Sequence, residues 1–352
     1  MKEMPIATVI GVVLLSSQGL FAASAQAASR CDIRLEARGS YMFPDNTRVA
    51  GRRFGGLSGM DFEPRSQRML FVSDERTGVD EAAVFVSAPV TVDKQGLDLG
   101  PLSLQPLRGL PADAGIDFEA MRMLPHRQGW LIASEGGADA SVPPWFASFD
   151  GKGRLRWKSP LPAPLEQSPH NRSIESLAFD EAGDLWIALE NALPGDGPQG
   201  DATRGAELRM ARFRVEKDRP PVAIDSQQLY RTEPAEPDGA AGVSDIGISE
   251  MLIVGGTWWV MERSGTPSAD GRYRFRSRLF CVEPARLSKT LLLDSRDELD
   301  PLEANLEAMT IIRRAGRPPL LVIANDNNFA PGVATRVLLF EILSRRSEFR
   351  LQ

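Results

Sequence analysis

The sequence predicts an all-β fold, a β-propeller with five blades, or six if one blade has lost its sequence signature. A six-residue pattern recurs five times, each copy is followed by a second apolar run, and no long stretch has helical periodicity. With 352 residues, 42% of them hydrophobic, the chain can bury a sizeable core, and propellers of this length often form one unit. We therefore expect residues 28–352 to form a single propeller domain.

The N-terminus has the features of a secretory signal peptide. Lys2 precedes an apolar run, Ile6–Leu15, and small residues end at Ala27, after which we expect cleavage. No later stretch reaches the roughly 18 apolar residues of a membrane span. Residues 1–27 are therefore excluded from the fold, and the mature protein is expected to be periplasmic or secreted.

The formal net charge is −6, and Lys and Arg form no dense stripe. Nucleic-acid binding depends on such basic surfaces, so nucleic acid is not an expected partner. We expect a monomer whose partner is an anionic small molecule.

The repeated pattern has apolar residues in its first, fourth and sixth positions. Its second position, called slot two below, is Glu or Ser. The five copies are Leu57–Phe62, Phe118–Met123, Ile174–Phe179, Ile248–Ile253 and Leu306–Ile311. Their spacing sets the size of each predicted blade.

A second apolar run follows each copy and ends in an acid. These runs are Met69–Asp74, Trp130–Glu135, Leu185–Glu190, Trp258–Glu262 and Leu320–Asp326. Turn-forming residues separate the two segments, so each unit predicts a buried β-hairpin. Two more strands fit after a hairpin, for example Leu208–Val215 and Gln227–Tyr230, which gives the four strands of a propeller blade. The segment Glu233–Gly239 is expected to be a surface insertion.

The last unit has room for only three strands and ends near Thr335–Ile342. We expect Ile33–Tyr41 to supply the missing outer strand, because this closure removes an exposed sheet edge. In an exported protein we expect the two cysteines, Cys31 and Cys281, to form a disulfide, and the alternative is that they remain unpaired thiols.

Antiparallel strands bring slot two and the closing acid of each hairpin to the same end. The expected pairs are Ser58 with Asp74, Glu119 with Glu135, Glu175 with Glu190, Ser249 with Glu262, and Glu307 with Asp326. If the hairpins are innermost, eight carboxylates converge on one mouth of the axis.

Two carboxylates about 5 Å apart repel by roughly 3 kcal/mol at an effective dielectric near 20. Such a cluster needs a compensating cation, arginine or proton. Hard oxygen ligands in a flexible cage favour Ca²⁺, for which the candidate ligands are Glu119, Glu175, Glu307 and Asp326. The alternative is that these acids are solvated turn residues.

Three arginines lie close in sequence to these acids: Arg76, Arg172 and Arg263. They are candidates to clamp an anionic group, with Asp74 and Glu135 as further ligands or bases. Of the two histidines, His126 is expected on the surface, whereas His170 could reach the site. No P-loop, dinucleotide fingerprint or G-x-S-x-G elbow is present.

The chain resembles the phytase-like propeller family, described by "esterase-like activity of phytase", from about Phe54 to Leu343. The resemblance is carried by Gly56–Asp61, Ser73–Arg76, Ser134–Gly136, Asn171–Glu175, Met261–Arg263, Asn305–Met309 and Asn325–Phe329. It implies an exported hydrolase-like propeller with calcium-dependent phosphoesterase activity. The chain departs from the family's glycine preference at Ala120, Ser173, Ser176 and Ala308.

Two functions are compatible with these residues. In the first, the protein is a metal-dependent hydrolase of phosphate esters or related esters. In the second, it is a non-catalytic binding module whose cation stiffens the axis. Propellers host both uses, and lactonases among others, so the fold alone cannot decide between them.

Overall fold

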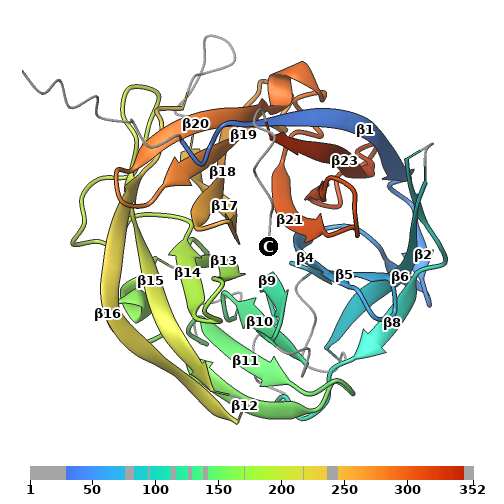
Figure 1. The fold of residues 1–352 in the computed structure, drawn as a ribbon, viewed down its shortest axis with the longest axis horizontal. Coiled ribbons are helices and arrows are strands. Elements are labelled where there is room, and N and C mark those ends of the chain that lie inside the picture. Colours follow the sequence, from blue (N-terminus) through green and yellow to red (C-terminus); the bar gives the residue numbers. More distant parts are fainter. Residues whose placement is uncertain are drawn as a thin grey trace, which may run out of the picture.

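The computed structural model describes residues 29–75, 83–93, 96–111, 116–125, 129–137, 142–169, 171–216, 218–235 and 245–344. Within these ranges the strands form five large sheets arranged around a central axis (Figure 1). The same ranges contain no α-helix, only short 3-10 turns such as η2 (Leu165–Gln167) and η3 (Ser295–Asp297). The predicted five-bladed propeller is therefore confirmed.

Each blade is an antiparallel sheet whose first strand lies nearest the axis. Blade 1 contains β4 (Leu57–Glu63), β5 (Arg68–Ser73), β6 (Val84–Val92), β7 (Leu97–Leu99) and β8 (Ser103–Pro106), and blade 2 contains β9 (Phe118–Met123), β10 (Trp130–Ser134), β11 (Trp145–Phe149) and β12 (Leu155–Pro160). Blade 3 contains β13 (Ile174–Phe179), β14 (Leu185–Leu189), β15 (Glu207–Glu216) and β16 (Arg219–Arg231). Blade 4 contains β17 (Asp245–Val254), β18 (Thr257–Pro267), β19 (Tyr273–Glu283) and β20 (Ser288–Asp294). Blade 5 contains β21 (Leu306–Ile312), β22 (Leu320–Asn325), β23 (Thr335–Ser344) and β1 (Ile33–Phe43). A separate small hairpin pairs β2 (Arg48–Val49) with β3 (Arg52–Arg53).

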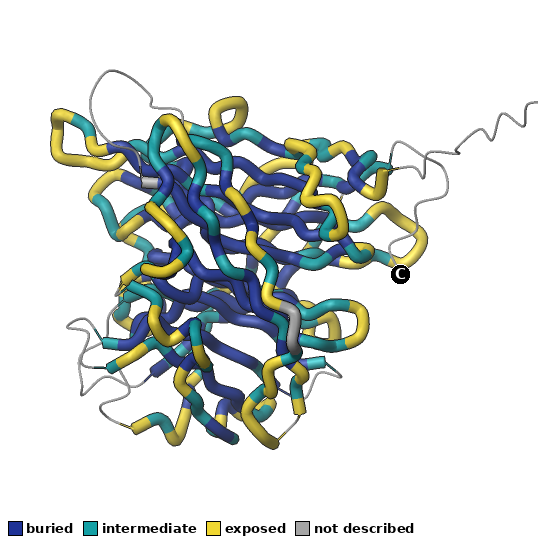
Figure 2. Tube along the Cα trace, turned by 90° about the vertical axis from the view of Figure 1, so that its left-hand side faces the viewer, coloured by how far each residue is buried: buried dark blue, intermediate teal, exposed yellow. Residues whose placement is uncertain are grey.

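The hydrophobic core lies between the blades rather than along the axis. Five clusters of buried side chains fill the five contacts between neighbouring sheets. Blades 1 and 2, for example, meet through Phe85, Phe118 and Ile132. Figure 2 shows the buried strands stacked inside a shell of exposed turns. The apolar side chains of the inner strands pack into these contacts between blades. The ends of the inner strands that face the axis carry polar residues instead.

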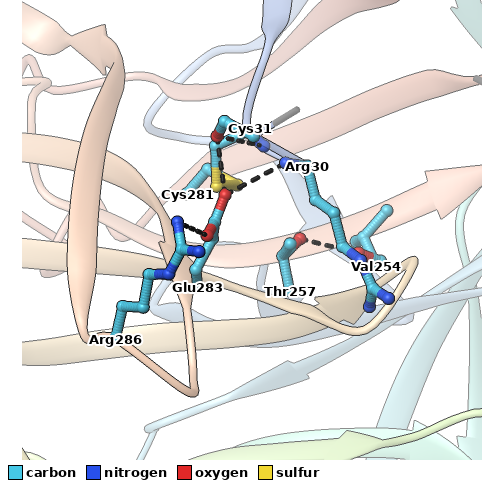
Figure 3. The surroundings of a disulfide bond; sticks show 8 residues. Arg30, Cys31, Val254, Thr257, Cys281, Glu283 and Arg286 are labelled. Carbon is cyan, nitrogen blue, oxygen red and sulfur yellow. Dashed lines mark hydrogen bonds and ion pairs between the residues drawn. A yellow bond between two sulfur atoms is a disulfide. The ribbon is translucent and has the colours of Figure 1, made fainter. Parts of the chain in front are cut away.

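The propeller closes as expected from the sequence. β1 pairs with β23 in blade 5, with Ile33 opposite Ser344 and Tyr41 opposite Val337. The expected disulfide also forms, between Cys31 and Cys281, with an S–S distance of 2.07 Å (Figure 3). Beside it, Glu283 accepts a hydrogen bond from the Arg30 backbone N–H at 3.0 Å. The bond joins the segment before β1 to β19, so the closing strand pairs in blade 5 and is tethered to blade 4.

Several remaining expectations concern segments at the margins of the fold. The predicted outer strands of blade 3 are confirmed as β15 and β16. Residues 1–27 and most of the predicted insertion, residues 236–239, lie outside the described ranges. Within those ranges, no helix is long and apolar enough to cross a membrane.

Candidate functional site

A β-bulge occurs at slot two in the innermost hairpin of every blade. The pairing register between first and second strands shifts at Ser58, Glu119, Glu175, Ser249 and Glu307. A bulge inserts one residue into one strand and re-aims a side chain locally. The repeated pattern in the sequence therefore encodes a repeated backbone irregularity as well as a strand.

Four closing acids lie one residue beyond the second strand of their hairpins. Each donates its backbone N–H to the carbonyl of the residue two before slot two, at 2.7–3.0 Å: Asp74 to Gly56, Glu135 to Asp117, Glu190 to Ser173 and Asp326 to Asn305. This bond fixes the closing acid beside slot two at the axial mouth.

Blade 4 differs from the sequence interpretation. β18 continues past the mouth, and Glu262 pairs with Ile248 inside the sheet, so Arg263 takes the position of the closing acid. Successive side chains in a strand point to opposite faces, and Glu262 therefore points away from the axis. The expected pairing of Ser249 with Glu262 at the mouth was wrong.

Glu262 instead belongs to a buried cluster between blades 3 and 4. Its carboxylate accepts hydrogen bonds from the Tyr230 hydroxyl at 2.7 Å, Lys289 Nζ at 2.7 Å and the Glu233 backbone N–H at 2.9 Å. The Glu262 carboxylate therefore connects blade 4 to blade 3 through hydrogen bonds.

The inner hairpins enclose an axial cavity of about 290 Å³. Among the described residues, eight carboxylates line it: Asp74, Asp117, Glu119, Glu135, Glu175, Glu190, Glu307 and Asp326. Seven of these were expected from the hairpin pattern, and Asp117 takes the place of Glu262. Only two described arginines, Arg172 and Arg263, lie in the same wall. The cavity therefore carries a large excess of potential negative charge.

Asp117 was not predicted as a cavity residue, although its position in the sequence relative to Glu119 could have indicated it. It stands two residues before Glu119, at the position whose carbonyl receives the closing-acid hydrogen bond in the other blades. Gly56, Ser173 and Asn305 hold the equivalent position, so only blade 2 places a carboxylate there.

Asp117, Glu119 and Glu135 form a close cluster of acids. One carboxylate oxygen from each lies within 4.8 Å of the others, and all three residues are buried. A hard cation with oxygen ligands 2.3–2.6 Å away, as for Ca²⁺, fits between oxygens at this separation. The all-oxygen donor set therefore fits a calcium-type ion, with Glu175 close enough for its charge to raise the pKa of Glu119.

Burial is the main electrostatic influence on these acids. It raises the pKa of Glu119, Glu175 and Asp326 well above their usual values, and neighbouring carboxylates raise each further. Burial also raises the pKa of Glu307 to about 8, although the Arg263 guanidinium acts in the opposite direction. A cation in the cavity would relieve the cost of ionising these groups.

Arg263 compensates part of this charge. Its guanidinium forms ion pairs with Glu190 and Glu307 and contacts Asn305 Oδ1 at 3.3 Å. Arg263 of blade 4 therefore pairs with acids of both neighbouring blades, 3 and 5. Arg172 also lines the cavity, whereas Arg76, His126 and His170 lie outside the described residues.

A buried ion pair that the sequence did not reveal joins the inner strands outside the lining of the cavity. Arg122 of β9 contacts Glu250 of β17 at 2.6 Å. Arg122 also donates to the Met60 carbonyl of blade 1, while Glu250 accepts from Ser176 Oγ of blade 3 and the Met309 N–H of blade 5. The pair thus touches all five inner strands, and we call it the axial plug.

Several solved structures resemble this chain distantly. No curated protein matches the chain. Among solved structures, a GH43_1 enzyme from Xanthomonas citri has 11% identity and a TM-score of 0.47, covering 90% of this chain and 94% of that one. The catalytic domain of a Coprinopsis cinerea GH62 alpha-L-arabinofuranosidase has 11% identity and a TM-score of 0.44, covering 87% and 97%. The periplasmic gluconolactonase of Pseudomonas aeruginosa has 14% identity and a TM-score of 0.38, covering 83% and 90%. These distant likenesses do not bear on activity.

The family comparison is more informative, because it concerns this chain's own sequence. The phytase-like family, described as "Esterase-like activity of phytase", matches residues 52–329. That range spans most of the chain, from the segment before β4 to the loop after β22, and includes all eight cavity acids. The chain belongs to the phytase-like family.

Proposed function

We propose that the protein is an exported, calcium-dependent hydrolase of phosphate esters or related esters. The observation that carries this proposal is the cluster of Asp117, Glu119 and Glu135, three buried carboxylates with oxygens within 4.8 Å, in a cavity that also contains Arg172 and Arg263. Cation ligands and guanidinium groups in one cavity suit a substrate that is itself an anion.

Different walls of the cavity would have different roles. Asp117, Glu119 and Glu135 would hold the cation, which would supply charge to neutralise an ester oxyanion and lower the pKa of a bound water. Arg263, already fixed by Glu190 and Glu307, would orient the anionic group. Asp74, a carboxylate of blade 1 in the same cavity, is our candidate to accept a proton from the attacking water.

The sequence-based ligand set was Glu119, Glu175, Glu307 and Asp326. In the proposed arrangement Glu119 remains a ligand and Glu175 stands beside it, while Glu307 is engaged by Arg263. Asp326 accepts hydrogen bonds from Asn305 at 3.0 Å and the Asn328 backbone N–H at 2.6 Å, and so is oriented within the wall.

The test is an activity screen with a matched variant. EDTA-treated protein is assayed with 4-nitrophenyl phosphate, bis(4-nitrophenyl) phosphate and a γ-lactone, with and without added Ca²⁺. We expect calcium-dependent hydrolysis of a phosphate ester and its loss in Glu119→Gln. Hydrolysis of the lactone alone would redirect the assignment to a lactonase.

A non-catalytic role has one observation in its favour: Arg263 is already paired with two carboxylates of the wall. If Ca²⁺ binds and stabilises the protein but no ester is turned over, the cation is structural and the propeller is a binding module. The same screen therefore separates the two functions.

A further inference from the structure

The hairpin of β18 and β19 is extended in blade 4 beyond the axial mouth. In the other blades the second strand ends at Ser73, Ser134, Leu189 or Asn325, one residue before the closing acid. In blade 4, Arg263 holds the position of that acid, and pairing continues to Pro267 opposite Tyr273. Four further residues at about 3.3 Å each raise this sheet roughly 13 Å above the level of Arg263.

Side-chain alternation decides which residues of the extension face the axis. Arg263 faces the cavity, so Gly265 lies on the same face two residues later. Across the ladder Gly265 is opposite Phe275, and Pro267 is opposite Tyr273, which places both aromatic residues on this face. Both aromatic residues and Gly265 line the axial cavity.

Phe275 and Tyr273 form a stacked pair. Their ring centroids are 6.1 Å apart, with an interplanar angle of 24°. Gly265 makes room for them, since a Cβ there would lie 3.3 Å from the Phe275 ring and 3.4 Å from the Tyr273 ring. The Phe275 N–H donates to the Pro301 carbonyl at 2.8 Å, which holds the strand in place.

Tyr273 is unusually open to solvent for an aromatic residue. It is 53% exposed, and it is the only aromatic residue among the large exposed hydrophobic side chains of the described ranges. Burial of an aromatic ring is favourable, so an aromatic platform at the rim of a polar cavity offers binding energy to a ligand that covers it.

We propose that Tyr273 and Phe275 bind the alcohol portion of the substrate and select esters whose alcohol carries a ring. This inference rests on the proposed function, because it assumes that the anionic group lies near Arg263. The Gly265–Phe275 pair lies two residues further along the sheet than Arg263, about 7 Å at 3.3 Å per residue, so a ring joined to the anion through a methylene group would extend towards Phe275. The cavity would then recognise a charged head and a ring together.

The experiment uses two non-hydrolysable anions, benzylphosphonate and methylphosphonate. They share the charged group and differ in the ring, so binding is measured without turnover. Calorimetry on the calcium-loaded protein should show benzylphosphonate binding about three- to tenfold more tightly, the range expected for one aromatic contact. Tyr273→Ala should remove this difference while leaving methylphosphonate affinity unchanged. Tyr273→Phe, which keeps the ring, should preserve the difference.

The outcomes separate the two proposals. Equal affinities in the wild-type protein, or a preference that survives in Tyr273→Ala, would overturn the ring-binding role while leaving the hydrolase assignment intact. If neither phosphonate binds at millimolar concentration, the placement of an anion near Arg263 is wrong, and the ring-binding role falls with it. Calcium-dependent ester turnover, measured separately, reports on the hydrolase assignment alone.

Discussion

Arg122 and Glu250 approach to 2.6 Å in the centre of the propeller, where both side chains are almost completely buried. Further hydrogen bonds reach backbone or side-chain groups of blades 1, 3 and 5, so one ion pair connects the inner strands of every blade. This arrangement makes the pair a stability determinant that is separate from the cavity chemistry.

Breaking the axial plug should destabilise the protein strongly. Arg122→Met leaves the buried Glu250 carboxylate without its counter-ion, and loss of one partner of a buried pair costs about 3–5 kcal/mol. Urea unfolding should show this loss, whereas Arg122→Met combined with Glu250→Leu should recover part of it. As a control, Glu216→Gln in the exposed pair with Arg219 should have no measurable effect. A stable Arg122→Met variant would contradict the role assigned to the plug.

Calcium should stabilise the native protein. A ligand that binds only the folded state raises the melting temperature, so EDTA should lower it and added Ca²⁺ should restore it. Glu119→Gln should weaken calcium binding at least tenfold in calorimetry, because it removes one ligand charge from the buried cluster. Glu298→Gln, an exposed change in the described chain, should leave binding unaltered. An EDTA-insensitive melting temperature would argue that arginines and protons alone compensate the acids.

The calcium-free protein should lose stability as the pH rises from about 5 to 8. Glu119, Glu175, Glu307 and Asp326 have raised pKa values when folded, reaching about 8 for Glu307, so the native state holds more protons than the unfolded state in this range. The stability that these protonated acids contribute is complete at pH values below the pKa that they have in the unfolded chain. It disappears as the pH rises past the pKa that they have in the folded protein.

Melting temperatures of EDTA-treated protein at pH 5, 6, 7 and 8 measure this effect. Glu307→Gln cannot ionise and should flatten part of the decline. Because Ca²⁺ competes with these protons, its stabilising effect should be larger at pH 8 than at pH 5. A melting temperature that rises from pH 5 to pH 8 would show that ionising these acids does not destabilise the folded protein.

The disulfide should contribute substantially to stability. Cys31 and Cys281 are 250 residues apart in sequence, and removing a native disulfide costs about 2–5 kcal/mol. Cys31→Ala/Cys281→Ala should melt at lower temperature than the oxidised wild type, and dithiothreitol should lower only the wild-type value. Free alkylation of both thiols in protein isolated without reductant would contradict the bond.

The sequence predicted the fold well because the repeated features are local. Each apolar hexapeptide and its following run carry the information for one hairpin, and the short final unit points to closure by the N-terminal strand. The convergence of the slot-two residues also follows from repetition, since equivalent positions in equivalent hairpins meet at the axis.

The errors at the cavity have a common physical cause. Glu262 ended an apolar run as the other acids do, but its strand continues, and a one-residue difference reverses the direction of a side chain. The axial plug depends on which inner strands meet at the axis, and that information lies in the assembled fold and not in any single repeat. The Tyr273 platform depends on how far the β18–β19 hairpin of blade 4 continues, which the repeated pattern does not specify.

The closure of the ring also affects the order in which the protein can form. β1 precedes every other described strand in the chain, and its partner β23 follows them all. The described strands of the other four blades are therefore made before β1 can pair with β23, and blade 5 is the last of the five to be completed. The first described strand therefore completes the last blade. Cys281 lies in β19, which is made before β23, so the disulfide can hold β1 beside blade 4 before its partner strand exists.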